Sequence, residues 1–428
     1  MASEQFGVLT DAAIERSRLR NGVPEPLSTA PHNYEVTADA IRHFAHAYGD
    51  DNPLFCDRGH AVTARWGALI APPTFHYTMG EDGAPTPSPE VKERLKGDPF
   101  AGLGSYQAMM EFVWWRPLKI GDTQKCLRAQ VGVAAKTSAF GGRSAHVTRA
   151  FIYTDGSGSP TALRRGTWVN TERHTSRRRK KETQAPQPYT DDQLAEIDAI
   201  YAAEDRRGAQ PRYWEDVAVG EQLPVKVKGP LTTTDVVVWH LGWGMQLTPP
   251  GAYKLAYRVR TKVPGLFPRN RLNVPDTVQR LHWEPERAHE LGLPTSYDYG
   301  AMRETWLAHA LTDWMGDDGW LWQLSVQHRG FNYIGDTTWV RGHVTGKRIE
   351  AGHHVVDVAL RCENQRGAVT SPATACVLLP THDRSVQLPV PPAYTQDELL
   401  AHEVARYRAE SDGEIVWDPL LTRPPTVE

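Results

Sequence analysis

The chain has 428 residues, 40% hydrophobic and 23% charged, a composition typical of a folded protein with about two or three domains. Its formal net charge is −3, so no overall positive charge favours binding to nucleic acid or to an anionic membrane. Its cysteines stand far apart and match no zinc-site spacing, so we expect buried thiols at Cys56, Cys126, Cys362 and Cys376. We therefore expect no metal, no cofactor and no nucleic acid.

The N-terminal residues show no targeting or membrane segment. The first 20 residues lack an apolar core, and no apolar run in the chain approaches the roughly 20 residues that a membrane span requires. We therefore expect a cytoplasmic protein that does not associate with membranes.

The first informative stretch is YGDDNPLFCD, residues 48–57. Acidic and amide side chains before Pro53 favour a sharp turn, and the apolar residues that follow indicate a buried element. A carboxylate held at such a turn, here Asp50, can perform acid–base chemistry if a second group lies beside it. Phe55 occupies the position that would supply this group, so the stretch is either a structural turn or an incomplete site.

The clearest boundary lies at residues 173–192, which are rich in basic residues and proline and nearly free of apolar residues. This composition indicates a solvated linker, followed by a helix with Thr190 or Asp191 as its N-cap. The two sides of the linker form a diverged repeat. Ile-Gly-Asp-Thr occurs at 120–123 and at 334–337, each time after an arginine and before strand-like segments.

A second pair of related segments lies upstream in each half. DRGHA at 57–61 and EPERA at 284–288 share the spacing from an acid to an alanine, and each precedes a glycine and a turn rich in proline and threonine. These patterns predict that each half is a helix wrapped by an antiparallel sheet, and that the two halves pack as a pseudo-dimer. After Pro380 the chain is proline-rich and then helical, which indicates an arm on the surface or on a second subunit.

These residues resemble the signature of MaoC-like (R)-specific enoyl-CoA hydratases and dehydratases, Gly-Asp-x-Asn-Pro-Leu/Ile-His followed by x-Asp. The first half matches it at Gly49, Asp50, Asn52, Pro53, Leu54 and Asp57. The turn APPTF at 71–75 is similar to the N-terminal dehydratase domain of that superfamily, and LHWEPERAHELGLP at 281–294 is similar to the back end of the motif. The resemblance covers roughly residues 30–172 and 212–380. It implies an α+β double hotdog fold, in which two repeats each wrap a curved antiparallel β-sheet around a long central helix.

In that family, an Asp and a His five residues apart bind the water that adds to a trans-2-enoyl thioester, and a backbone N–H at the start of the central helix polarises the thioester carbonyl. Here the pair is split between the halves. Asp50 stands at the Asp position of the first half, whereas His282 stands at the His position of the second half, whose acid aligns near Met245. A structural turn, a catalytic acid and a substrate-positioning role all stay open for Asp50, and a core histidine stays open for His282.

His282 needs a partner, and SYDYG at 296–300 offers Asp298 directly before the predicted central helix. A helix cap is the alternative role for Asp298, whereas Gly300 would let a carbonyl approach the backbone closely. We therefore expect His282, Asp50 and Asp298 to be catalytic. The expected substrate-binding residues are Gly300, Tyr299, Tyr297, Asn52, Phe55, Arg258 and Arg260.

Arg258 and Arg260 belong to an insertion at residues 245–276. The insertion contains six basic residues, and Asp276 is its single acid. A clamp or lid for the phosphates of CoA would have this composition, and so would a solvated basic loop.

The sequence thus predicts an N-terminal hotdog at 1–172, a linker and helix at 173–211, a C-terminal hotdog at 212–380 and an arm at 381–428. The expected activity is reversible hydration of a trans-2-enoyl-CoA thioester, with the thioester as substrate. A hotdog thioesterase and a catalytically inactive acyl-CoA-binding subunit are the alternatives. Because hotdog folds commonly pair further, we also expect a homodimer of double hotdogs.

Overall fold

The protein is described by a computed structural model that covers residues 7–27, 29–138, 142–172, 186–245 and 251–411. Its centre is a ten-stranded sheet in the order β1-β3-β4-β5-β2-β7-β10-β9-β8-β6. Neighbouring strands are antiparallel, except that β1 runs parallel to β3. The strands are β1 (Glu81–Asp82), β2 (Gly104–Trp114), β3 (Lys125–Ser138), β4 (Gly142–Thr154), β5 (Pro160–Thr171), β6 (Lys226–Lys228), β7 (Trp320–Gln327), β8 (Thr338–Glu350), β9 (His353–Asn364) and β10 (Val369–Leu378).

The sheet consists of two equivalent halves that meet where β2 pairs with β7. From this junction outward, the order β2-β5-β4-β3 in the first half corresponds to β7-β10-β9-β8 in the second. The outermost of these strands carry matching register shifts, between Gln130 and Gly132 in β3 and between Val344 and Gly346 in β8. The predicted repeat and the double hotdog fold are therefore confirmed.

The two Ile-Gly-Asp-Thr segments form the same turn. Gly121 and Gly335 have φ values of 89° and 94°, a left-handed conformation that favours glycine. In each turn the aspartate accepts a hydrogen bond from the backbone N–H three residues earlier, at 3.0 Å: Asp122 from Lys119, and Asp336 from Tyr333. The repeated residues therefore encode a repeated local conformation.

The two central helices differ, and this detail departs from the expectation of a long helix in each half. In the second half, α11 (Gly300–Met315) has 16 residues and is buried from Ala301 to its end. In the first half, the corresponding segment is η1, a six-residue 3-10 helix (Pro73–Thr78). It ends because the chain turns into β1 at Gly80, where φ is +107° and an added Cβ would lie 2.6 Å from Cβ of Cys126.

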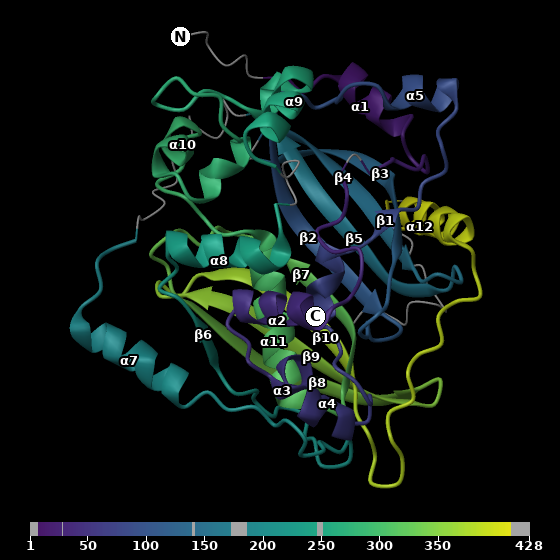
Figure 1. The fold of residues 1–428 in the computed structure, drawn as a ribbon, viewed down its shortest axis with the longest axis vertical. Coiled ribbons are helices and arrows are strands. Elements are labelled where there is room, and N and C mark those ends of the chain that lie inside the picture. The colour runs from purple at the N-terminus through teal and green to yellow at the C-terminus, as the bar shows by residue number, and fades with distance from the viewer. Residues whose placement is uncertain (1–6, 28, 139–141, 173–185, 246–250, 412–428) are drawn as a thin grey trace.

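The remaining helices cover the sheet and its ends. Figure 1 shows α2 and α8 beside each other in front of α11, and their contact is close enough that a Cβ on Gly242 would lie 2.6 Å from Cα of Phe44. These helices are α1 (Asp11–Arg18), α2 (Ala38–Ala47), α3 (Pro53–Cys56), α4 (Arg58–Thr63), α5 (Pro89–Leu95), α7 (Asp191–Ala202), α8 (Thr233–Trp243), α9 (Lys254–Lys262), η2 (Pro264–Leu266), η3 (Val278–His282), α10 (Pro285–Glu290) and α12 (Gln396–Ser411).

The segments outside the two halves have distinct positions. Thr190 caps α7 through a reciprocal capping box with Gln193, as expected, whereas the basic run 177–181 lies outside the described residues. Within the C-terminal arm, α12 packs on β3 and β4 of the first half (Figure 1). None of the helices in the described ranges is both long enough and apolar enough to cross a bilayer.

Candidate functional site

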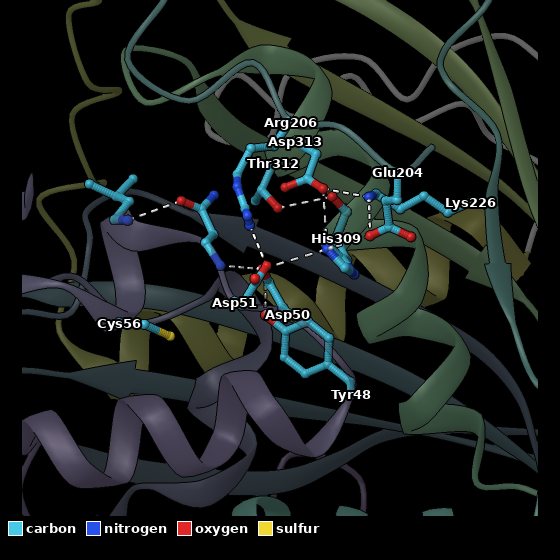
Figure 2. Close-up of polar contacts among 12 residues, drawn as sticks. Tyr48, Asp50, Asp51, Cys56, Glu204, Arg206, Lys226, His309, Thr312 and Asp313 are labelled. Carbon is cyan, nitrogen blue, oxygen red and sulfur yellow. Dashed lines mark hydrogen bonds and ion pairs between the residues drawn. The ribbon is translucent and has the colours of Figure 1, made fainter. Parts of the chain in front are cut away.

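Asp50 follows α2 and is almost completely buried (Figure 2). Its Oδ1 accepts a hydrogen bond from the backbone N–H of Asn52 at 2.9 Å, which closes the turn before Pro53. Its Oδ2 accepts a hydrogen bond from the hydroxyl of Tyr48 at 2.8 Å. The structural-turn interpretation of Asp50 therefore accounts for contacts to both of its oxygens.

The imidazole of His309, in the middle of α11, lies across the half-to-half interface from Asp50. The distance from Nε2 of His309 to Oδ1 of Asp50 is 3.6 Å, and that to Oδ2 of Asp313 is 3.3 Å. The ammonium of Lys228 lies 3.0 Å from Nδ1 of His309 and donates to the backbone oxygen of Tyr48. Because the ammonium can only donate, Nδ1 accepts and the imidazole hydrogen lies on Nε2, facing the carboxylates.

Lysine side chains balance the charge of this cluster. Lys226 contacts the carboxylate of Asp313 and lies 2.8 Å from that of Glu204. Burial opposes the charge on Asp313, but His309 and Lys226 outweigh it and lower the pKa of this carboxyl to about 2. Burial lowers the pKa of Lys228 to about 8.

The cluster also contains residue types that bind metal ions. Asp50, His309 and Asp313 offer ligand atoms that all lie within 4.8 Å of one another. Two ammonium groups already contact this set, so a divalent cation would be repelled by both. We therefore interpret it as an ion network that joins the halves, in which the segment after α7 takes part through Glu204 and through the ion pair between Arg206 and Asp51.

The expectation that Asp50 partners His282 is wrong. Asp50 meets α11 at His309, whereas His282 meets the residue just before that helix, Tyr299. Gly300 and His309 are nine positions apart in α11, which corresponds to about 13 Å along the helix axis. Spacing along the chain could not reveal this separation, because it depends on how the halves dock.

Phe55 and Asn52 line a cavity at the C-terminal end of α11. The cavity also touches Pro72 and Pro73 of the first half and Thr312 and Met315 of α11, and it leaves about 30 Å³ of space for water centres, room for roughly two water molecules. The side chain of Asn52 itself caps α3 by accepting from the N–H of Leu54. Phe55 therefore lies in an apolar wall, as its residue type suggests, and acyl binding there stays a prediction.

His282 ends η3 in a buried aromatic environment. Its Nδ1 lies 2.8 Å from the backbone oxygen of Tyr297, so Nδ1 carries the hydrogen and Nε2 keeps its lone pair. Its ring lies against that of Tyr299, tilted by 30° with the centroids 3.8 Å apart. Burial lowers the pKa of His282 to about 3, so the imidazole is neutral at physiological pH.

Tyr299 is held in turn by two polar side chains and precedes the first residue of α11. Its hydroxyl accepts from Nε2 of Gln279 at 2.9 Å and lies 2.9 Å from Nε2 of His240. No side chain caps the N-terminus of α11, so its first N–H groups are available to a negatively charged or carbonyl oxygen. The structure thus brings three predicted residues together, His282, Tyr299 and Gly300, with Tyr297 beside them.

Asp298 does not supply the missing carboxylate beside His282. Its Oδ2 lies 3.0 Å from Nε of Arg303 and accepts from the amide of Asn332 at 3.3 Å. Burial outweighs this pairing and raises the pKa of Asp298 to about 6. The expectation that Asp298 partners His282 is therefore wrong, because the side chain is directed to the arginine one turn inside α11.

Sequence reasoning missed a second buried cluster on α11. Oε1 of Glu304 lies 2.9 Å from Nε2 of His328, and Glu304 also accepts from the hydroxyl of Tyr77 and the amide of Gln107. The signal was present in the sequence: the predicted central helix carries a glutamate, and a charged side chain that is buried requires partners.

The basic insertion packs next to the turn that carries His282. Arg280 of η3 donates to the backbone oxygens of Pro268, Arg269 and Asp276, and so ties the insertion to this turn. Helix α9 has no buried residue and carries Arg258 and Arg260 on the outside of the molecule. Residues 246–250 of the insertion lie outside the described residues.

Comparison with known proteins identifies related sequences and folds. Residues 27–163 match the family model described as FAS1-like, dehydratase domain region. A UPF0336 protein of Thermobifida fusca is 36% identical over 99 residues, covering 22% of this chain and 60% of that protein. A UPF0336 protein of Streptomyces coelicolor is 34% identical over 113 residues, covering 26% and 67%.

A solved structure described as a MaoC-like dehydratase shares the fold over most of this chain. The TM-score is 0.56 at 18% identity, and the match covers 84% of this chain and 98% of the other. The family model thus matches the first half, whereas the structural match includes both halves.

Proposed function

Because residues 27–163 match the FAS1-like dehydratase-region model and the chain shares the fold of a MaoC-like dehydratase, we propose that it is a MaoC-like hotdog dehydratase that adds water reversibly to a trans-2-enoyl-CoA thioester. His282 would be the acid–base residue, and the N–H of Gly300 would donate to the thioester carbonyl. The observation that carries the proposal is the hydrogen bond from Nδ1 of His282 to Tyr297, because it leaves Nε2 as a proton acceptor on a ring that contacts Tyr299, the residue before α11.

The proposed hydration uses Nε2 of His282 as the proton acceptor and the N-terminus of α11 as the oxyanion site. Nε2 of His282 takes a proton from water while the water oxygen bonds to Cβ of the substrate. The electrons of the C=C bond move toward the carbonyl oxygen, where the first N–H groups of α11 and the helix dipole stabilise the negative charge. Cα then receives a proton, and dehydration follows the same steps in reverse.

Other parts of the proposal rest on composition and position. The insertion tied down by Arg280 carries the basic residues that we propose for the phosphates of CoA, Arg258 and Arg260 among them. Tyr297 and Tyr299 would wall the reacting group. A cytoplasmic location and a homodimer of double hotdogs belong to the same proposal.

The test is hydration of crotonyl-CoA, followed by loss of the enoyl thioester absorbance and, in parallel, by release of free CoA. We expect hydration by the wild type and at least a ~100-fold loss of kcat for His282→Ala and His282→Asn, the low end for general acid–base catalysis. His289→Ala is the matched control, because the exposed His289 also contacts a backbone oxygen, that of Pro294; it should keep wild-type turnover.

Three results would contradict the proposal. Release of CoA without hydration would identify a thioesterase. Binding of thioesters without turnover would identify an inactive acyl-CoA-binding subunit. Near wild-type hydration by folded His282→Ala would remove His282 from the chemistry.

A further inference from the structure

The proposed site needs a second proton-transferring group, and neither signature segment supplies it. Nδ1 of His282 contacts the backbone oxygen of Tyr297 rather than a carboxylate. Asp50 meets α11 about 13 Å further along the helix, and Asp298 pairs with Arg303. A proton must nevertheless reach Cα when water adds to Cβ.

Glu304 lies on the same face of α11 as Gly300, because residues four apart in a helix lie one above the other. The two residues also share neighbours. An added Cβ on Gly300 would lie 3.0 Å from Nε2 of His328 and 3.1 Å from Oε1 of Gln107, the side chains that hold Glu304. The carboxylate and its imidazole therefore lie directly beside the first turn of the helix.

The partners of Glu304 distinguish it from the other buried carboxylates of α11 and its N-terminus. Asp313 contacts Lys226 and Asp298 contacts Arg303, so permanent cations hold both. The charged partner of Glu304 within the described chain is His328, with a neutral phenol and a neutral amide as further donors. Because Oε1 of Glu304 lies 2.9 Å from Nε2 of His328, the two groups can share one proton.

We infer that Glu304 and His328 form the second acid–base pair of the proposed site and transfer the proton at Cα of the substrate. The inference rests on the proposed function. In hydration the pair gives up one proton, which bonds to Cα as the electrons return from the carbonyl oxygen. The proton that His282 took from water then restores the pair through solvent, so the net change is addition of one water.

The geometry also indicates how the substrate reaches the pair. Gln107 is half-buried and lies at a register shift in β2, whereas the other two partners of Glu304 are buried. A substrate at Gly300 would take the place of the Gln107 amide on Oε1. The second nitrogen of His328, Nδ1, stays 3.1 Å from the hydroxyl of Ser371, which keeps the ring in position.

Charged groups around the pair come from several elements. Arg303 lowers the pKa of His328 in addition to the larger effect of burial, whereas Glu304 raises it. Arg164 of β5 lies 4.3 Å from the ring of Tyr77. Burial lowers the pKa of His282 to about 3, below the range of the pH profile that tests the inference.

The experiment measures kcat and KM for crotonyl-CoA from pH 5 to 9 in the wild type, Glu304→Gln, Glu304→Asp and His328→Asn, with thermal unfolding of each. We expect Glu304→Gln to lower kcat at least ~100-fold, with KM changed less than about threefold, and to remove one limb of the profile. Glu304→Asp keeps a carboxylate and should retain more activity. The matched control is Asp313→Asn, a buried carboxylate nine residues further along α11, which should lower stability but leave kcat unchanged.

The outcomes separate the inference from the proposed function. If Glu304→Gln keeps kcat within threefold while His282→Ala is inactive, the inference is wrong and the proposed function stands. Equal losses in Glu304→Gln and Asp313→Asn would show a structural effect and overturn the inference. If Glu304→Gln does not fold, an unchanged pH profile in His328→Asn overturns it. A wild type that hydrates no enoyl thioester refutes both.

Discussion

The two halves of the chain share a strand order but differ in what surrounds the retained residue of the divided motif. In the first half, Asp50 lies in a network of lysines, carboxylates and a histidine, and the adjacent central helix is six residues long. In the second half, His282 lies among aromatic rings beside a helix of 16 residues. Permanent charge stabilises an interface, whereas a neutral imidazole at a free helix N-terminus can exchange protons. Related motif segments thus have a structural role in one half and a proposed chemical role in the other.

The largest expected difference concerns the two motif residues themselves. His282→Asn should lower crotonyl-CoA hydration at least ~100-fold, because Nε2 is lost as the proton acceptor. Asp50→Asn should keep turnover within about threefold and lower the unfolding temperature, because its contacts are to Tyr48, Asn52 and His309. Steady-state rates and thermal unfolding of both variants decide this, and loss of turnover in folded Asp50→Asn would contradict the comparison.

The equivalent turn aspartates should differ in stability. Asp336 is fully buried, and both of its oxygens accept from Arg366 at 2.7 Å, whereas Asp122 is about a quarter exposed and lies 3.6 Å from Arg116. Asp336→Ala should therefore cost about 3 kcal/mol, and Asp122→Ala about 1 kcal/mol or less. Urea unfolding measures both free energies. Equal losses would show that the buried Asp336–Arg366 pair stabilises the fold no more than the partly exposed Asp122–Arg116 pair does.

The glycines at the matching register shifts of β3 and β8 test the packing of α12. An added Cβ on Gly132 would lie 1.9 Å from the ring of Tyr407 in α12, whereas one on Gly346 would lie 3.3 Å from the end of the Asp357 side chain. Gly132→Ala should therefore displace α12 and cost about 2 kcal/mol, and Gly346→Ala well under 1 kcal/mol. The free energy of unfolding and the rate of proteolysis within α12 provide the measurement, and unchanged proteolysis of Gly132→Ala would refute the displacement.

The smallest effect concerns Lys228, whose pKa is lowered to about 8 by burial from an ordinary 10.5. Between these values the unfolded chain binds the proton and the folded chain does not, so stability rises with pH through this residue. From pH 8 to pH 9 the gain should be about 1 kcal/mol, and it should be absent in Lys228→Met. Chemical unfolding at several pH values tests this, and parallel curves for both proteins would contradict it.

The sequence revealed the features that depend on local chemistry. A glycine with positive φ followed by an aspartate that caps the turn makes the Ile-Gly-Asp-Thr repeat readable, and the repeat implied the two-part sheet. Thr190 was identifiable as an N-cap because its side chain accepts a hydrogen bond from a backbone N–H only three residues away. The short length of the first central helix could not be predicted from the sequence, because it depends on the close approach of Gly80 to β3.

The candidate site could be predicted only in part, because some of its contacts join residues that are far apart in the sequence. The placement of His282 beside Tyr299 and Gly300 follows from the order of elements within one half. Asp50 and Glu304 each have a partner from the other half: His309 is 259 residues from Asp50, and Tyr77 is 227 residues from Glu304. Spacing carries no information about such contacts, and the charged residues within a buried helix were the available signal.

The pairing of β2 with β7 within one chain has an evolutionary consequence. Two identical subunits joined by such a pair would share every substitution, so a change that suits one copy of a site would be imposed on the other. A single gene that encodes both halves removes this constraint, and each half can mutate independently. Loss of a histidine at Phe55 and loss of an acid near Met245 could then accumulate separately, while the shared sheet kept both halves in register.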